Sequence, residues 1–317
     1  MKDLSKNLLY EIENEPRRRP YAARVDFLLG EDVELSFEYP ACLLSTSQAI
    51  LQMRLAPEQP MGPLQHLKKF RIEVAGFTKA SEAEAAGLHL AIALLWAAVS
   101  KRFTMRLDYH TSLPCIVYDR TISSSGGVSL SGFAKSYWPL STHDFAELLE
   151  EDVLDYTRPV DQQLLLSMEL FAAARLEVSD RARFISLVSS LEPLALSSNN
   201  PESIQNLISA FEKQLESVEV SELPMDEISI LKNSLKGRLV ELRKESIRQV
   251  ILRVVRELLP GDRIALKIID DAYSLRSNIL HEGIIDPYLD RKVVHIEGII
   301  RRMYASKIGK DLKVPAA

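Results

Sequence analysis

The sequence predicts an α+β domain followed by an all-α bundle of helices, and three observations support this fold class. Between residue 21 and about residue 135, short stretches alternate apolar and polar residues at the period of a β-strand, around one long helix rich in alanine and leucine. From residue 160 onward, apolar residues recur at helical spacing in almost every segment. Pro159 stands between the two patterns, and a chain of 317 residues is long enough for about two domains.

These patterns give the expected domain boundaries. We expect residues 1–20 to form an N-terminal tail and residues 21–142 a small α+β domain that senses or recognises a ligand. Residues 143–159 read as an acidic helix and linker, because the proline at its end disfavours a continuing helix. The helical bundle then covers residues 160–310.

Four segments of the first domain are typical of strands. Residues 21–39 contain two strand-like stretches around a Gly-Glu-Asp sequence, which predicts a hairpin. The sequence FRIEVAG at 70–76 predicts another strand, and FTMRLDYH at 103–110 and CIVYDR at 115–120 predict two more.

A long helix lies between these strands. Ser81 is the expected N-cap, and Glu84 three residues later completes the pattern of a capping box. The apolar run 85–99 has 15 residues, fewer than the ~20 that a bilayer crossing needs, so we expect a buried helix. The Gly- and Ser-rich segment 123–132 lacks the Gly-x-x-x-x-Gly-Lys-Ser/Thr pattern of a phosphate loop, and we expect a flexible turn there.

The second domain is expected to contain helices only. The segment 179–195 begins at a Ser-Asp cap and places Phe184, Leu187, Val188, Leu191 and Ala195 on one stripe. The other expected helices cover 159–178, 200–217, a long stretch from 224 to 259, 262–281 and 287–307.

The composition excludes several classes of protein. Formal charge is −5, but residues 226–317 carry 18 Lys and Arg against 13 Asp and Glu, which hints at an acidic ligand near the C-terminal part, with a solvated basic surface as the alternative. Cys42 and Cys115 are far apart and suit a reducing cytoplasm. The charged N-terminus does not resemble a signal peptide, so we expect a cytoplasmic protein that does not contact membranes.

No spacing of histidines suggests a metal site, and we expect no metal and no cofactor. The chain also lacks a Gly-x-Gly-x-x-Gly sequence, a nucleophile elbow and a Walker lysine. Among enzymatic reactions, cleavage of phosphodiesters is the one for which the sequence offers candidate catalytic residues. The histidines outside the motif described next are expected to be structural or exposed: His66, His89, His110, His143 and His295.

The segment YSLRSNILHEG at 273–283 carries that argument, because it places Arg276 and His281 near the end of a helix. We expect the helix to face the core with Ala265, Ile268, Ala272, Leu275 and Ile279, and to place the arginine and histidine on either side of the opposite face. Tyr273, Ser277 and Leu280 share that face with them, so we expect a cover for it, most simply a second copy of the same helix.

Arginine and histidine together suit RNA cleavage without a metal. Histidine exchanges a proton near neutral pH, and arginine binds phosphate through a planar fork of donors. The pair can move a proton to or from a ribose 2′-hydroxyl or the leaving 5′-oxygen while it stabilises charge on the phosphorus. The alternative is structural: both side chains interact with the last carbonyls and the helix dipole, and Gly283 ends the helix.

The segment resembles the Arg-x4-6-His motif of the HEPN superfamily, and it looks most like the ApeA-like HEPN branch. Arg276 and His281 match the motif, Tyr273 precedes it, and the earlier helix with Glu192 is also similar. The resemblance covers about residues 160–307. Ser277 departs from the Asn, Asp or His that active members commonly carry after the arginine, and Asn278 is a neighbour that could substitute for it in binding.

The resemblance implies a bundle that forms a homodimer and a metal-independent endoribonuclease that leaves a 2′,3′-cyclic phosphate. Arg276 and His281 are then the catalytic residues, with RNA as the partner and a regulatory protein as a further expected partner. Prokaryotic defence or a toxin-like stress response is the setting that the superfamily suggests. A noncatalytic module that binds RNA or protein is the alternative. Four basic residues after the motif are candidates for contact with the RNA backbone: Arg291, Lys292, Arg301 and Arg302.

Overall fold

The computed structural model describes residues 17–30, 34–35, 41–45, 50–55, 67–109, 113–122, 139–140, 159–177, 179–218, 224–283 and 286–313. Three expected features lie outside the described residues: most of the N-terminal tail, the Gly- and Ser-rich turn at 123–132, and the acidic helix at 143–156. His66, His110 and His143 also lie outside them.

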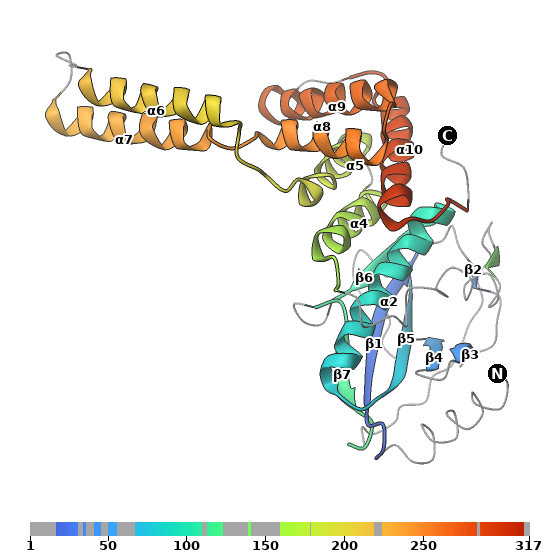
Figure 1. Cartoon of the computed structure of the whole chain (residues 1–317). Helices are drawn as coiled ribbons and strands as arrows, with labels where there is room; N and C mark the ends of the chain where they lie inside the picture. Colours follow the sequence, from blue (N-terminus) through green and yellow to red (C-terminus); the bar gives the residue numbers. More distant parts are fainter. Residues whose placement is uncertain are drawn as a thin grey trace. The chain divides into compact units, whose positions relative to one another are not determined.

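An antiparallel sheet with strand order β3-β4-β5-β1-β6 forms in the first part of the chain, and β7 pairs with β1 as well (Figure 1). The strands predicted at 70–76, 103–110 and 115–120 correspond to β5, β6 and β7. This confirms the α+β character of the region. The strands of this sheet are β1 (Tyr21–Leu29), β3 (Ala41–Ser45), β4 (Ile50–Leu55), β5 (Lys68–Phe77), β6 (Met105–Asp108) and β7 (Ile116–Asp119).

The hairpin predicted within residues 21–39 is wrong. β1 lies between β5 on one edge and β6 and β7 on the other, so its backbone groups are taken up by strands distant in sequence. The second stretch forms the short strand β2 (Glu34–Leu35), which pairs in parallel with β8 (Pro139–Leu140). Most of β1 is buried, and a strand buried on both faces gains more from two long neighbours than from one short local partner.

One face of β1 carries a buried ion pair. Asp26 is 2% exposed and lies opposite Arg71 in the register with β5. Its two carboxylate oxygens accept from the Nε and Nη2 of Arg71 at 2.7 and 2.9 Å. The neighbouring residues Val25 and Phe27 point to the other face and are fully buried among apolar side chains.

Helix α2 (Ala80–Lys101) packs against the sheet and is the long helix predicted from the sequence. Among the described helices it is the one that is long and apolar enough to cross a membrane by composition, but 83% of its most apolar window is buried inside the protein. It is therefore a core helix. Its predicted capping box is wrong: Lys79 is the N-cap, no side chain caps the helix, and Ser81 lies within the first turn.

Gly87 on α2 lets the helix approach the sheet closely. A Cβ atom at this position would lie 2.8 Å from the Cβ of Cys115 and 2.9 Å from the Cβ of Ala23. The Cys115 thiol is buried, and this burial raises its pKa to about 11. Ala23 and Cys115 both belong to the packed interior, so neither neighbour can yield without a shift of backbone.

We expect Gly87→Ala to lower the free energy of unfolding, because overpacking a core forces backbone shifts that cost about 1–3 kcal/mol. The gain in helix propensity from glycine to alanine, about 1 kcal/mol, offsets only part of it. Urea unfolding followed by circular dichroism measures the change. Gly237→Ala is the matched control, because a Cβ there meets nothing within 4 Å, and it should be neutral or stabilising.

The helical part of the chain is divided between two compact units. Unit 1 combines residues 1–190 with 288–317, and unit 2 is 191–287. The expected bundle of 160–310 is therefore distributed over both. Unit 1 contains α4 (Gln162–Ala174), α5 (Asp180–Ser189) and α10 (Leu289–Ile308), and unit 2 contains the 3₁₀ helix η2 (Glu192–Leu194), α6 (Glu202–Ser217), α7 (Met225–Glu241), α8 (Ile247–Leu258) and α9 (Arg263–Glu282).

A buried carboxylate explains why α4, α5 and α10 group with α2. Glu297 on α10 is 1% exposed and accepts hydrogen bonds from three arginines of three other segments. Arg175 at the end of α4 and Arg183 on α5 each bond it at 2.8 Å, and Arg102 after α2 bonds it at 3.2 Å. Arg102 adopts φ 59°, the one positive φ among described residues other than glycine.

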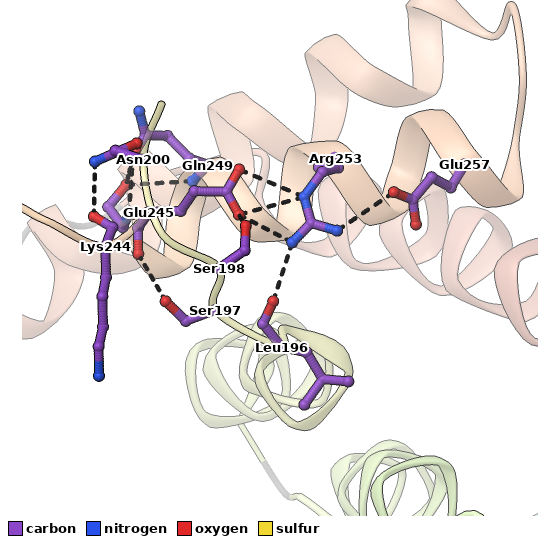
Figure 2. Close-up of polar contacts among 10 residues, drawn as sticks. Leu196, Ser197, Ser198, Asn200, Lys244, Glu245, Gln249, Arg253 and Glu257 are labelled. Carbon is purple, nitrogen blue, oxygen red and sulfur yellow. Dashed lines mark hydrogen bonds and ion pairs between the residues drawn. The ribbon is translucent and has the colours of Figure 1, made fainter. Parts of the chain in front are cut away.

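The stretch predicted as one helical pattern from 224 to 259 is broken between α7 and α8. Ser246 caps α8 and forms a capping box with Gln249. The break is held by residues from before α6, as Figure 2 shows: Ser198 donates to Glu245 at 2.6 Å, and Glu245 accepts from Arg253 at 2.9 Å. The side chain of Asn200 also donates to the carbonyls of Leu242 and Lys244.

Candidate active site

Helix α9 carries the Arg/His motif, and both of its ends are capped. Asp262 accepts a hydrogen bond from the backbone of Ala265 at 2.8 Å, and Gly283 ends the helix in the left-handed conformation with φ 68°. The helix thus ends where the sequence predicted. Its buried residues are Ala265, Ile269, Ala272 and Ile279, so Ile269 takes the place expected of Ile268, while Ile268 and Leu275 are half-buried.

Arg276 points toward η2 within unit 2. Its Nη2 lies 3.0 Å from the Oε1 of Glu192, and its guanidinium carbon lies 5.8 Å from the centre of the Tyr273 ring. The arginine side chain is 22% exposed and the glutamate side chain 33%. The structure therefore brings together three residues that the sequence singled out, and it holds the motif arginine between a carboxylate and an aromatic ring.

The same cluster changes the acidity of the tyrosine. Burial, followed by the nearby carboxylate of Glu192, raises the pKa of Tyr273, and the positive charges of Arg276 and Arg248 lower it by less. The phenol therefore keeps its proton at neutral pH, so it can donate a hydrogen bond but is not a base.

His281 is exposed in the last turn of α9. Five residues of helix separate it from Arg276 by about 7.5 Å along the axis and about 140° around it. The two side chains therefore leave α9 on different sides, as the sequence predicted. Ser277, which we expected on the face opposite the core, is half-buried, and Asn278 is exposed.

The basic face of α8 is largely engaged in ion pairs. Arg248 bonds Asp270 of α9 at 2.6 Å, which lowers the pKa of that carboxyl. Arg253 pairs with both Glu245 and Glu257. These residues form a charged helix surface, and each exposed pair is worth little on its own.

The four candidates for RNA-backbone contact lie on α10 in unit 1, whereas the motif lies in unit 2. Arg301 is wrong as a candidate, because it is 1% exposed and its guanidinium donates to the carbonyls of Val99 and Ser100. Desolvation lowers the pKa of this buried arginine to about 10. Arg291 is exposed and lies over the Tyr288 ring at 5.9 Å. Lys292 is exposed and Arg302 half-buried.

Two acidic residues of unit 1 escaped the sequence analysis. Glu297 is the centre of the arginine cluster, and burial raises the pKa of Glu169 on α4 to about 7. Perturbed carboxyls often mark functional sites, but Glu169 belongs to unit 1 and the motif to unit 2. Each of the two glutamates lies on the apolar side of its helix. A helical projection of the sequence could therefore have identified both of them. Among the described residues, no group of three His, Cys, Asp or Glu side chains is placed to hold a metal ion.

Comparisons with known proteins find no match to this chain among family models, curated proteins or solved structures. The resemblance to the HEPN superfamily is therefore carried by the motif residues on α9 and by Glu192. It stays a prediction.

Proposed function

We propose that this protein is a cytoplasmic, HEPN-type endoribonuclease that cleaves RNA without a metal, in a site formed by two copies of α9. The observation that carries the proposal is the arrangement at the end of α9: Arg276 is fixed by Glu192 and Tyr273, and His281 is exposed about 1.4 turns later. A held arginine is pre-organised for phosphate, and an exposed histidine is accessible to RNA.

The reaction is an attack of the ribose 2′-hydroxyl on the adjacent phosphorus. One His281 takes the proton of the 2′-hydroxyl as general base, and a second donates a proton to the leaving 5′-oxygen as general acid. Arg276 stabilises the negative charge that develops on the phosphoryl oxygens. The products are a 2′,3′-cyclic phosphate and a 5′-hydroxyl end.

Two copies are needed because each chain supplies one motif histidine, and acid and base must act on opposite sides of the same phosphate. A two-fold dimer supplies both groups and is the commonest closed assembly. The exposed side chains of Leu280 and His281 lie at the end of α9 where a second copy would cover them. By analogy with the superfamily, the setting is prokaryotic defence or a stress response, with a regulatory protein as an additional partner.

A noncatalytic RNA-binding or protein-interaction module is the second candidate, and one contact favours it. The 3.0 Å ion pair with Glu192 neutralises the motif arginine and occupies part of its donor fork. Ser277 also stands at the position where active HEPN members commonly carry Asn, Asp or His. Under this reading, the same residues hold the fold of unit 2 or a bound partner, and no bond is cleaved.

The deciding experiment is incubation of the purified full-length chain with total cellular RNA in EDTA, followed by analysis of the RNA ends. The nuclease reading predicts fragments with cyclic phosphate and 5′-hydroxyl ends. Intact RNA that is retained by the protein and released as salt rises would support the module reading, because salt-dependent retention reports phosphate contacts. Intact RNA with no retention would contradict both RNA-based readings.

A further inference from the structure

Helices α6 and α7 form a hairpin that cannot bury its own apolar residues. The two helices lie side by side, joined by ion pairs of Glu216 with Lys236 at 2.9 Å and of Glu212 with Arg243 at 2.7 Å (Figure 1). Ile208 is the one buried residue of α6, and no described side chain of α7 is buried. A pair of helices with a single buried side chain lacks the core that normally stabilises such a pair.

The uncovered apolar residues form a regular stripe on each helix. On α6 they are Ile204, Leu207 and Phe211, with Val218 directly after the last residue of the helix, and each is at least 40% exposed. With Gln214 they recur at alternating steps of three and four, which is the spacing of a coiled-coil seam.

The stripe on α7 repeats the pattern with one charged member. Ile228, Leu231, Leu235 and Leu242 alternate in the same steps, and Arg238 occupies the remaining position. Leu231 and Leu242 are 42% and 58% exposed. Both stripes border one open groove of about 310 Å³, whose lining includes Phe211, Val218, Leu235 and Leu242. The hairpin therefore presents half of a helical bundle.

The charges of α7 indicate which partner completes the bundle. Asp226 and Glu227 lie in the first turn, and Arg238 lies in the last. In an antiparallel pair of α7 helices that sets Leu231 of each copy opposite Leu235 of the other, Arg238 comes level with Glu227 and Ile228 of the other copy. Arg238 of one copy can then pair with Glu227 of the other, and two-fold symmetry forms this ion pair twice. A polar residue within an apolar seam fixes the register of such a pair.

The size of the face also suits a dimer. Two helices of about 17 residues present a face about 25 Å long and about 20 Å wide. Its flat area is on the order of 500 Å², and the uneven surface of the side chains adds to this. Stable protein interfaces bury about 800 Å² per partner, and smaller ones are transient. The hairpin face therefore supplies most of what a specific interface requires.

We propose that the α6–α7 hairpin docks on the same hairpin of a second copy of this chain, and that the two form an antiparallel four-helix interface. The interface uses residues of α6 and α7 and none of the motif on α9, so it does not rest on the proposed ribonuclease function. The α6–α7 interface is therefore a second contact between two copies, separate from the one proposed at α9.

Sedimentation equilibrium of the full chain at micromolar concentrations tests the proposal. We expect the wild type to weigh twice the 35.8 kDa chain mass. Leu235→Glu should weaken the dimer by about 30-fold or more, the effect of losing a central interface residue. Ile230→Glu is the matched control, since Ile230 is 70% exposed but lies off the stripe, and it should leave the dimer intact.

A charge exchange protects the test from misfolding. Arg238→Glu should weaken the dimer, and Glu227→Arg combined with it should restore the dimer. Both positions are exposed in the single chain, so neither substitution should disturb its fold. A monomeric wild type would overturn the proposal and leave a foreign helix as the occupant of the groove. In a Leu280→Glu background, which alters the exposed face of α9 proposed to meet a second copy, a dimer that survives Leu235→Glu, or one that Ile230→Glu disrupts equally, would also overturn it. None of these readouts involves RNA, so the outcome is independent of whether α9 cleaves.

Discussion

Replacing Glu297 by alanine is expected to lower the free energy of unfolding by about 3–5 kcal/mol, the cost of breaking a buried ion pair from one side. Glu297 is 1% exposed and is the shared acceptor of Arg102, Arg175 and Arg183. Without it, three partly buried guanidiniums from three segments repel one another near the buried Arg301. Urea unfolding followed by tryptophan fluorescence measures the loss, because Trp96 is buried on α2, the helix that leads to Arg102.

Glu257→Ala is the control for this prediction. Glu257 also pairs with an arginine, at 3.3 Å from Arg253, but its side chain is 58% exposed. We expect it to cost less than about 0.5 kcal/mol, as exposed helix pairs do. Equal effects of the two alanine variants would contradict the role assigned to Glu297. Glu297→Gln should fall between them, because the amide keeps one acceptor oxygen and the volume of the side chain but loses the charge.

The elements that the sequence predicted correctly are those whose signal is local and repeated. Alternation over residues 70–76 located β5, and the long apolar run located α2, because burial of one face or of the whole element imposes the period on the sequence itself. The end of α9 was located for the same reason, since Gly283 is required by its positive φ.

The elements that the sequence missed depend on partners far along the chain. The pairing of β1 with β5 joins residues about 45 positions apart, and no local residue specifies it. The break between α7 and α8 has neither glycine nor proline and is held instead by Ser198 and Asn200, more than 40 residues earlier. Long-range contacts of this kind override local propensity and leave no local pattern.

The candidate site also contains residues that the sequence identified and one whose burial depends on residues far along the chain. The resemblance to the Arg-x4-6-His motif singled out Arg276, Tyr273 and Glu192, and the structure places the three together, although the helix expected over 179–195 ends at Ser189 and Glu192 lies on the separate 3₁₀ helix η2. The burial of Arg301 was not predicted, since an arginine on an amphipathic helix is normally exposed. What takes it inside is a pair of carbonyls at the end of α2, about 200 residues earlier.

His281→Ala is expected to lower the rate of RNA cleavage by about 10²–10⁴, the contribution of a general acid or base, if α9 forms the proposed site. The fold should be unaffected, because His281 is exposed in the last turn of α9 and surface substitutions usually change stability by less than about 0.5 kcal/mol. Cleavage of a labelled RNA under single-turnover conditions in EDTA measures the rate, and circular dichroism checks the fold.

Two further variants separate catalysis from binding. His295→Ala removes an exposed histidine of α10 that has no part in the proposed site, and it should cleave at the wild-type rate. Arg276→Lys keeps the positive charge beside Glu192 but removes the planar fork, so it should lower the rate by about 10²–10³, as the loss of a donor to a developing oxyanion does. If His281→Ala cleaves as fast as wild type, the histidine is not the proton carrier and the activity belongs elsewhere. If RNA is bound but not cleaved by any variant, including the wild type, the Arg276–Glu192 pair is a structural contact and the module reading stands.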